Sequence, residues 1–154
     1  MRIGIGYDLH KIEEGRRLFL GGVEIPSERG AIAHSDGDVL LHAICDAVLG
    51  ACALGDIGKY FPDTSEKYKD IKSLKLLKET VVLATESGLK KIINVDTVVV
   101  CDEPKLAPYI EEMKKTISEV LEISIGAVGI KATTSEGTAP GVASSYAVIL
   151  IEKA

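Results

Sequence analysis

Apolar and polar positions along the chain fall into short runs typical of strands and longer runs with helical spacing. Residues 2–9 predict an N-terminal strand, and residues 17–20 and 23–25 predict two short strands joined by the hairpin dipeptide Gly21-Gly22. Runs rich in β-branched residues predict further, buried strands at 92–101, 128–133 and 143–151. The chain is therefore expected to form a sheet.

Longer segments place apolar residues at the spacing of a helix. The first is residues 38–54, with apolar side chains at positions 39, 40, 43, 44, 47 and 48. A second helix is expected over about 71–87, ended by Gly88, and a third over about 105–121, after Pro104.

The sequence His34-Ser35-Asp36-Gly37-Asp38 is typical of a helix start. Ser35 can cap the helix, and Asp38 three residues later completes a capping box, in which Asp is weaker than the usual Glu. This motif therefore has a purely structural interpretation.

The order of these elements predicts an α+β fold. We expect a single domain over residues 1–154, with a mixed sheet covered by helices on one face and a ferredoxin-like core. A chain of 154 residues that is 46% hydrophobic suits one domain, and it can bury roughly two-thirds of its unfolded surface. No repeat, low-complexity stretch or linker suggests a domain boundary.

Charge and apolar content exclude several classes of partner. A net charge of −5 argues against binding to nucleic acid, which needs a basic face. No signal-like segment opens the chain and no apolar run approaches the ~18 residues that span a membrane.

Cys45, Cys52 and Cys101 lie in apolar stretches without a C-x-x-C pair, so we expect buried, reduced thiols and no disulfide. These features predict a cytoplasmic protein.

Three residues form a candidate metal site: Asp8, His10 and His42. Asp8 and His10 are two residues apart in a strand and so point the same way, while His42 lies in the middle of a helix. Three N/O ligands with a fourth position open are typical of catalytic zinc. Asp38 and Asp46, four residues on either side of His42, could accept the second N–H of its imidazole. Spacing alone leaves another interpretation open, in which His10 caps a strand end and His42 is a hydrogen-bonded helix residue.

Several segments, in order and across nearly the whole chain, resemble those of one family, the 2-C-methyl-D-erythritol 2,4-cyclodiphosphate synthases. They are Gly6–His10, Gly21–Pro26, Ala33–Asp38, Leu54–Gly58, Phe61–Asp63, Asn94–Asp96, Pro104–Leu106 and Lys131–Glu136. The resemblance implies a lyase of non-mevalonate isoprenoid biosynthesis. It implies conversion of 4-diphosphocytidyl-2-C-methyl-D-erythritol 2-phosphate to the cyclic diphosphate and CMP, by a homotrimer with active sites between subunits.

The same resemblance implies two metal ions. Asp8, His10 and His42 resemble the ligands of Zn²⁺, and Glu136 resembles the ligand of a second divalent cation, Mg²⁺ or Mn²⁺. A carboxylate with phosphate oxygens is the ligand set that such a hard cation prefers.

The resemblance also implies roles for residues around the metals. His34, Asp36, Thr134 and Glu136 resemble catalytic residues, with His34 and Ser35 on a loop that closes on substrate. The implied substrate-binding residues are Asp8, His10, His34, Ser35, Asp56, Ile57, Gly58, Phe61, Pro62 and Asp63, with Pro104, Lys105, Leu106, Ala132, Thr133 and Thr134 on the cytidine side. Ordinary turn or capping chemistry would equally explain residues such as Asp56.

The implied reaction needs no Ser-His-Asp arrangement. Its nucleophile is the substrate's own 2-phosphate, which is largely ionised at neutral pH because the second pKa of a phosphate monoester is about 6. The barrier is attack of an anion on an anion, so charge neutralisation by metals and alignment of the two phosphates carry the catalysis.

One segment departs from the family pattern. After Glu136 the family usually has a longer loop with a Phe and an Arg that shapes an anion site in the trimer's central cavity, whereas this chain has Gly137–Val142. The resemblance therefore does not extend to that anion site.

Two alternatives to the synthase remain. One is a zinc-dependent phosphoester hydrolase that uses the same three ligands to activate water. The other is a non-catalytic trimer that binds cytidine nucleotides without consuming them.

Overall fold

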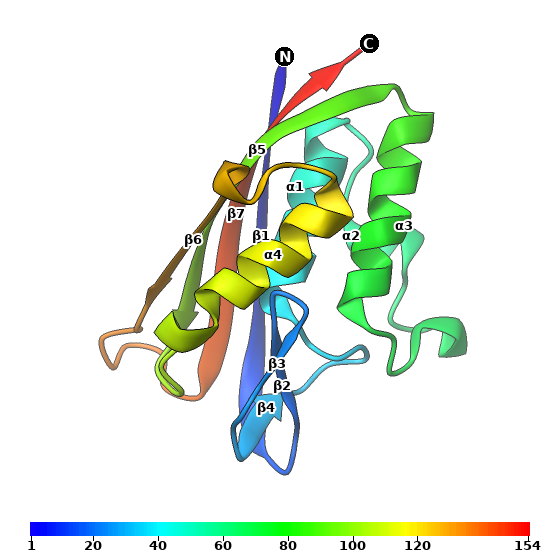
Figure 1. Ribbon diagram of the computed structural model, residues 1–154. Coiled ribbons are helices and arrows are strands. Elements are labelled where there is room, and N and C mark those ends of the chain that lie inside the picture. Colours follow the sequence, from blue (N-terminus) through cyan, green and yellow to red (C-terminus); the bar gives the residue numbers. More distant parts are fainter.

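The computed structural model covers residues 1–154. The chain forms a mixed five-stranded sheet with helices packed against one face (Figure 1). The strands are β1 (Arg2–Glu14), β4 (Arg29–Ala31), β5 (Leu89–Cys101), β6 (Val128–Thr133) and β7 (Val142–Lys153), with β2 (Leu18–Leu20) and β3 (Val23–Ile25) in a separate hairpin. The helices are α1 (Val39–Ala51), α2 (Ile57–Tyr60), α3 (Ser73–Glu86) and α4 (Ile110–Leu121). Short 3-10 turns are η1 (Glu66–Tyr68), η2 (Ala107–Tyr109) and η3 (Ile125–Ala127).

The sheet has the strand order β4-β1-β7-β5-β6. All neighbouring strands are antiparallel except β5 and β6, which are parallel and joined through α4. Because β1 pairs with β7 from Arg2 opposite Ile151, the two ends of the chain lie side by side (Figure 1). The predicted α+β class and mixed sheet are confirmed.

The predicted ferredoxin-like core is wrong. Such a core has the order βαββαβ, whereas here the long elements run β1-α1-α3-β5-α4-β6-β7. The two strands without a helix between them therefore come last. The α4 crossover makes β5 and β6 parallel, and β7 then pairs between β1 and β5.

Most predicted elements are present with shifted ends. β1 extends to Glu14 because its last residues pair with β4, a strand that the sequence did not predict. The helix predicted over 105–121 is divided into η2 and α4, with Pro108 in η2. The hairpin at Gly21-Gly22 is confirmed, and both glycines have positive φ, +61° and +78°, as its turn requires.

Two glycines let α1 lie directly on β1. A Cβ at Gly4 would be 1.8 Å from the carbonyl oxygen of Ala47, and one at Gly6 would be 1.9 Å from that of Ala43. Only a residue without a side chain fits at either position. Nearly every residue of α1 is buried in the core, so this helix is held in one place above the strand.

The opposite face of β1 and β7 carries exposed apolar side chains. They are Ile3, Ile5, Tyr7, Leu9, Tyr146 and Val148, exposed by 44–70%. The rings of Tyr7 and Tyr146 lie 4.6 Å apart between centroids. Cys45, Cys52 and Cys101 are buried, as predicted, and unpaired. No helix is both long and apolar enough to cross a bilayer.

Candidate active site

The predicted cluster of Asp8, His10 and His42 is present in the structure. Strand alternation puts Asp8 and His10 on the same face as Gly4 and Gly6, beneath α1, and α1 carries His42. The Asp8 Oδ2 atom lies 2.9 Å from His42 Nδ1 and 3.0 Å from His10 Nε2. One ligand atom from each of the three residues lies within 4.8 Å of the others.

The Asp8 carboxylate supplies the negative charge of the cluster. Burial alone would raise the pKa of Asp8, but the two neighbouring imidazoles outweigh it and lower the pKa to about 2. Burial alone would lower the pKa of His42, but the Asp8 carboxylate, together with the charges of Asp38 and Asp36, outweighs it and raises the pKa. Asp8 is thus an ionised carboxylate aimed between two ring nitrogens.

The donor set fits zinc. His10 Nε2 is buried and makes no hydrogen bond of good geometry, although Asp8 lies close to it. Tetrahedral zinc bonds of about 2.0–2.1 Å put neighbouring ligand atoms about 3.3 Å apart, close to the 2.9 Å and 3.0 Å that separate the Asp8 oxygen from the two ring nitrogens. A cation here would have three N/O ligands and a side facing the neighbouring cavity, where it could contact an oxygen of a bound molecule.

The second ring nitrogen of His42 bonds to serines. Its Nε2 atom lies 2.8 Å from Ser73 Oγ and 3.2 Å from Ser35 Oγ. The prediction that Asp38 or Asp46 would be its partner is wrong. Both carboxylates instead accept hydrogen bonds from backbone N–H groups, in the first turns of α1 and α2 and in the hairpin turn.

Asp38, and not Ser35, caps α1. The Asp38 carboxylate accepts hydrogen bonds from the backbone N–H of Leu41 at 3.0 Å, Gly21 at 3.0 Å and Gly22 at 2.7 Å. Ser35 instead accepts from the N–H of Gly37. Burial, with the nearby Asp36 charge, raises the pKa of Asp38 to about 6. One buried carboxylate therefore ties the β2–β3 hairpin to the start of α1.

Asp46 and Asp56 position α2. Asp46, on α1, accepts the N–H of Ile57 at 2.8 Å, and burial raises its pKa. Asp56 caps α2 by accepting the N–H of Lys59 at 3.1 Å. These two bonds place Ile57 and Gly58 at the wall of the cavity.

A cavity of about 620 Å³ opens beside the metal-ligating cluster. It is lined by predicted site residues, namely Asp8, His10, His34, Ser35, His42, Ile57, Gly58, Phe61, Pro62 and Asp63. Its other lining residues are Ile32, Ala33, Thr64, Tyr68, Ile71 and Leu76. Tyr68 packs edge-on against Phe61, with ring centroids 5.4 Å apart, and no local pattern in the sequence marked it.

The loop that carries His34 and Ser35 is fixed to the far wall of the cavity. His34 Nε2 lies 3.0 Å from the carbonyl oxygen of Ser65, and the His34 carbonyl accepts the N–H of Asp70 at 2.8 Å. The N–H of Asp36 donates to the Ile71 carbonyl at 3.1 Å. This loop and residues 65–71 thus form one continuous wall.

Other predicted site residues do not line this cavity. The Asp36 carboxylate is turned to Ser73, and Asp56 lies at the exposed start of α2. Leu106 is buried in the core, exposed by 4%. Sequence reasoning missed Ser73, because nothing in its local pattern distinguishes it from other polar residues at a helix start.

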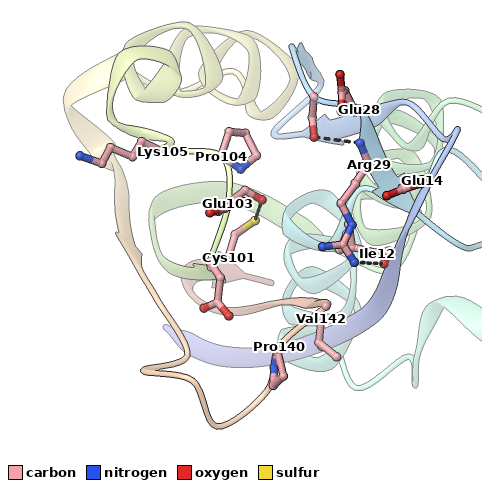
Figure 2. A pocket seen from close by; sticks show the side chains of 13 residues that line it. Ile12, Glu14, Glu28, Arg29, Cys101, Glu103, Pro104, Lys105, Pro140 and Val142 are labelled. Carbon is pink, nitrogen blue, oxygen red and sulfur yellow. Dashed lines mark hydrogen bonds between the residues drawn. The ribbon is translucent and has the colours of Figure 1, made fainter.

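Pro104 and Lys105 line a second cavity, of about 750 Å³. Figure 2 shows Pro104 and Glu103 on one side of it and Arg29 with Glu14 on the other, while Lys105 extends away from Arg29. The Arg29 guanidinium donates to the Ile12 carbonyl at 3.2 Å (Figure 2). Charges of both signs surround this cavity, and it does not include the metal-ligating cluster.

Ala132, Thr133, Thr134 and Glu136 are exposed at the end of β6 and in the turn after it. Because β6 is the edge strand beyond β7 and β5, these residues lie apart from the cluster on β1 and α1 within one chain. Thr134 Oγ1 donates to Glu136 Oε1 at 2.8 Å. Ser135 donates through its N–H and hydroxyl to the Asp102 carboxylate, which ties this turn to the end of β5.

The fold and cluster define an α+β protein with a candidate metal site beside a cavity, and comparisons with known proteins specify it further. A family model described as the YgbB family matches residues 1–152. The chain belongs to this family.

Curated relatives match the chain along its whole length. A 2-C-methyl-D-erythritol 2,4-cyclodiphosphate synthase of Syntrophomonas wolfei is 55% identical, with 100% of each chain covered. The protein of the same name from Chlorobaculum tepidum is 54% identical, again with 100% of each covered. A solved structure of such a synthase, in a CDP-bound form, matches with a TM-score of 0.93 and 41% identity, covering 98% of this chain and 100% of that one.

Proposed function

We propose that this protein converts 4-diphosphocytidyl-2-C-methyl-D-erythritol 2-phosphate to 2-C-methyl-D-erythritol 2,4-cyclodiphosphate and CMP, as a step of non-mevalonate isoprenoid biosynthesis. The observation that carries this proposal is the match, over full length and at more than half identity, to synthases named for this product. The cluster of Asp8, His10 and His42 beside a cavity supports it.

Asp8, His10 and His42 would hold Zn²⁺, and Glu136 would ligate a second divalent cation, Mg²⁺ or Mn²⁺. When bound, these ions would supply positive charge that offsets the negative charge of the diphosphate. The orphaned ring nitrogen of His10 and the ionised Asp8 support the first assignment. The exposed carboxylate of Glu136, an oxygen ligand, supports the second.

The reaction is an intramolecular displacement at phosphorus. An oxygen of the 2-phosphate forms a bond to the β-phosphorus, and the bond from that phosphorus to the bridging oxygen breaks. CMP leaves with the electron pair. Because the second pKa of a phosphate monoester is about 6, the nucleophile is already largely anionic at neutral pH and needs no general base.

The protein's own residues would chiefly position the substrate. Ile57, Gly58, Phe61, Pro62 and Asp63 form a wall that can hold the methylerythritol part. The loop with His34 and Ser35 would close over it together with residues 65–71, to which it is hydrogen-bonded, and Asp56, at the start of α2, would orient the wall that holds the methylerythritol part. Holding two phosphates in a reactive geometry can supply an effective molarity on the order of 10⁵ M or more.

The cytidine side of the site would come from a second copy of the chain. Pro104, Lys105, Leu106, Ala132, Thr133 and Thr134 lie away from the metal-ligating cluster within one subunit. An assembly that brings β5 and β6 of one subunit to the cluster of another would complete the site. The exposed apolar face of β1 and β7 supports assembly, since such a patch on a protein surface marks an interaction site. We infer a homotrimer that works in the cytoplasm.

Product analysis tests this function. Purified protein loaded with Zn²⁺ and Mg²⁺ is incubated with the diphosphocytidyl substrate, and products are followed by phosphorus NMR, with His42→Ala as the comparison. We expect cyclic diphosphate and CMP from the unsubstituted protein and neither from His42→Ala. Acyclic phosphate products would instead identify a hydrolase, and unchanged substrate with retained cytidine nucleotide binding would identify a binding protein.

A further inference from the structure

Ser73 links a metal-ligating histidine to a carboxylate on another segment. It is the first residue of α3, fully buried, and lies 31 positions from His42 in the sequence. Its hydroxyl oxygen is 2.8 Å from His42 Nε2 and also hydrogen-bonds to Asp36 Oδ1. The backbone N–H of Ser73 donates to the other oxygen of Asp36 at 2.9 Å.

The direction of these hydrogen bonds follows from the number of protons available. A serine hydroxyl has one proton and two lone pairs, and a carboxylate only accepts. Because a hydrogen bond to a charged acceptor is the stronger one, the Ser73 proton is directed at Asp36. Only lone pairs of Ser73 then face His42, so His42 must donate through Nε2–H.

The protonation of one ring nitrogen determines the role of the other. In a neutral imidazole with its proton on Nε2, the lone pair is on Nδ1. Nδ1 is the atom that lies 2.9 Å from Asp8 and faces the metal-ligating cluster. The chain of hydrogen bonds from His42 through Ser73 to Asp36 therefore directs the ligand lone pair of His42 at the metal.

We propose that Ser73 is a positioning residue that fixes the Nε2–H tautomer of His42, and that Asp36 acts through it. This role rests on the metal site proposed above. Ser73 does not line the cavity, so it has no direct contact with substrate to explain its burial beside His42. The carboxylates on α1 cannot replace it, because Asp38 and Asp46 are occupied by backbone N–H groups.

Ser35 is a weaker second acceptor. Its Oγ lies 3.2 Å from His42 Nε2, and it already accepts the N–H of Gly37 at 3.2 Å. Unlike Ser73, it has no hydrogen bond to a carboxylate among its contacts, so its own proton is free to turn either way. Ser35 alone therefore cannot fix the tautomer.

The first test is zinc affinity, measured by competition with a chelator. Loss of such an outer partner of a histidine ligand typically weakens metal binding 10–100-fold, and we expect this for Ser73→Ala. Ser118→Ala is the matched control, since Ser118 is also a buried helical serine but its hydroxyl bonds only to the Lys115 carbonyl of its own helix. The control should bind Zn²⁺ as the unsubstituted protein does.

Asp36→Asn tests the direction of the hydrogen bonds from His42 through Ser73 to Asp36 without removing the serine. An asparagine has one oxygen acceptor for the two donors of Ser73, so the hydroxyl proton can turn to His42 Nε2 and move the ring proton to Nδ1. We expect zinc binding to weaken to an extent comparable with Ser73→Ala. Thermal unfolding of the metal-free variants shows whether each is folded.

Nitrogen-15 NMR of the imidazole rings gives the second readout, which a merely structural role would not change. The chain has only three histidines, so each ring can be assigned from its nuclear Overhauser contacts to neighbouring residues without removing a ligand. In zinc-loaded protein we expect a protonated Nε2 on His42. In metal-free Ser73→Ala, at a pH where the His42 ring is neutral, we expect a mixture of the two tautomers.

The outcomes separate two failures. If Zn²⁺ does not bind the unsubstituted protein, the proposed metal site is wrong and this role falls with it. The positioning role alone is overturned if Zn²⁺ binds the two variants, Ser73→Ala and Asp36→Asn, as tightly as the unsubstituted protein while both variants are folded. It is also overturned if His42 has its proton on Nδ1 in the zinc-loaded protein.

Discussion

The three histidines of the chain line the same cavity but have different surroundings. His42 is held at both ring nitrogens, by Asp8 and by Ser73. His10 has a buried nitrogen without a hydrogen bond, and His34 bonds to a backbone carbonyl across the cavity. Only His10 and His42 have the Asp8 carboxylate beside a ring nitrogen, which makes these two, and not His34, the candidate metal ligands.

Zinc binding should discriminate among these histidines. Zn²⁺ at about a thousand times its Kd should raise the free energy of unfolding of metal-free protein by about 4 kcal/mol. His10→Ala should lose most of this gain, whereas His34→Ala should retain it. Denaturant titrations with Zn²⁺ or with chelator measure the difference, and an equal loss in both variants would contradict the ligand assignment.

Asp38→Asn should destabilise the protein by about 1–3 kcal/mol at pH 7, because one side of the amide would present N–H groups to the backbone N–H of Gly21 or Gly22. The matched control is Asp70→Asn on an exposed loop with positive φ, which Asn tolerates. Urea unfolding of both variants gives the comparison.

The stability contributed by Asp38 should depend on pH. Because burial raises its pKa from 3.8 to about 6, the folded state holds the proton more tightly than the unfolded state. The contribution of Asp38 to the free energy of unfolding is then most favourable below about pH 4 and falls as pH rises to about 6, by roughly 3 kcal/mol in total. Asp38→Asn should lack this slope between pH 4 and 6, and a slope unchanged by the substitution would show that other groups cause it.

At the scale of elements, the site depends on how closely α1 approaches β1. The glycines of β1 share a face with Asp8 and His10, so the same strand alternation that orients the ligands also clears the space for the helix. Asp38 and Asp46 then connect α1 to the β2–β3 hairpin and to α2, and Ser73 connects it to α3. The helix is therefore located by contacts on several sides.

Gly6→Ala should disturb this arrangement. Its Cβ would lie 1.9 Å from the backbone carbonyl of Ala43, so α1 must move away, at a cost of about 3 kcal/mol or more. Zinc binding should weaken as well, because α1 carries His42. Gly126→Ala is the control, since nothing lies within 4 Å of a Cβ there. Thermal unfolding and chelator competition test both variants, and a stable Gly6→Ala with normal zinc affinity would refute the role of the close approach.

At the scale of the whole molecule, the chain has an uncovered apolar sheet face and a divided set of predicted site residues. The face formed by β1 and β7 is exposed on the side away from the helices. The metal-ligating cluster and the turn with Glu136 belong to strands separated by β7 and β5. Assembly through this face would cover apolar surface and could join the two parts of a site between subunits.

Ile5→Lys should prevent this assembly. Ile5 is 68% exposed on that face, and burying a lysine charge between subunits is unfavourable. The unsubstituted protein should sediment as three chains of 16.4 kDa, and the variant as a smaller species without cyclising activity. Val82→Lys, which alters a 56% exposed side chain on α3, should leave both properties unchanged. A monomeric unsubstituted protein with full activity would disprove the shared site.

The sequence by itself determined the local features: the hairpin at Gly21-Gly22, most strands and helices, and the shared face of Asp8 and His10. These follow from spacing within a few residues, where the periodicity of strand or helix directly fixes which way a side chain points. The family resemblance added the candidate residues far apart in the chain.

Only the tertiary structure decided the strand order, the partners of Asp38 and Asp46, and the bond from Ser73 to His42. Each depends on groups brought together from distant positions, and buried polar atoms take whichever partner the packing provides. Asp46 lies one turn after His42 on α1, as predicted, whereas Asp38 is the extended N-cap before the helix. The carboxylates accept hydrogen bonds from backbone N–H groups of the hairpin and of α2 instead of from His42. Spacing along one element shows which side chains can meet, and the packing of several elements determines which of them do.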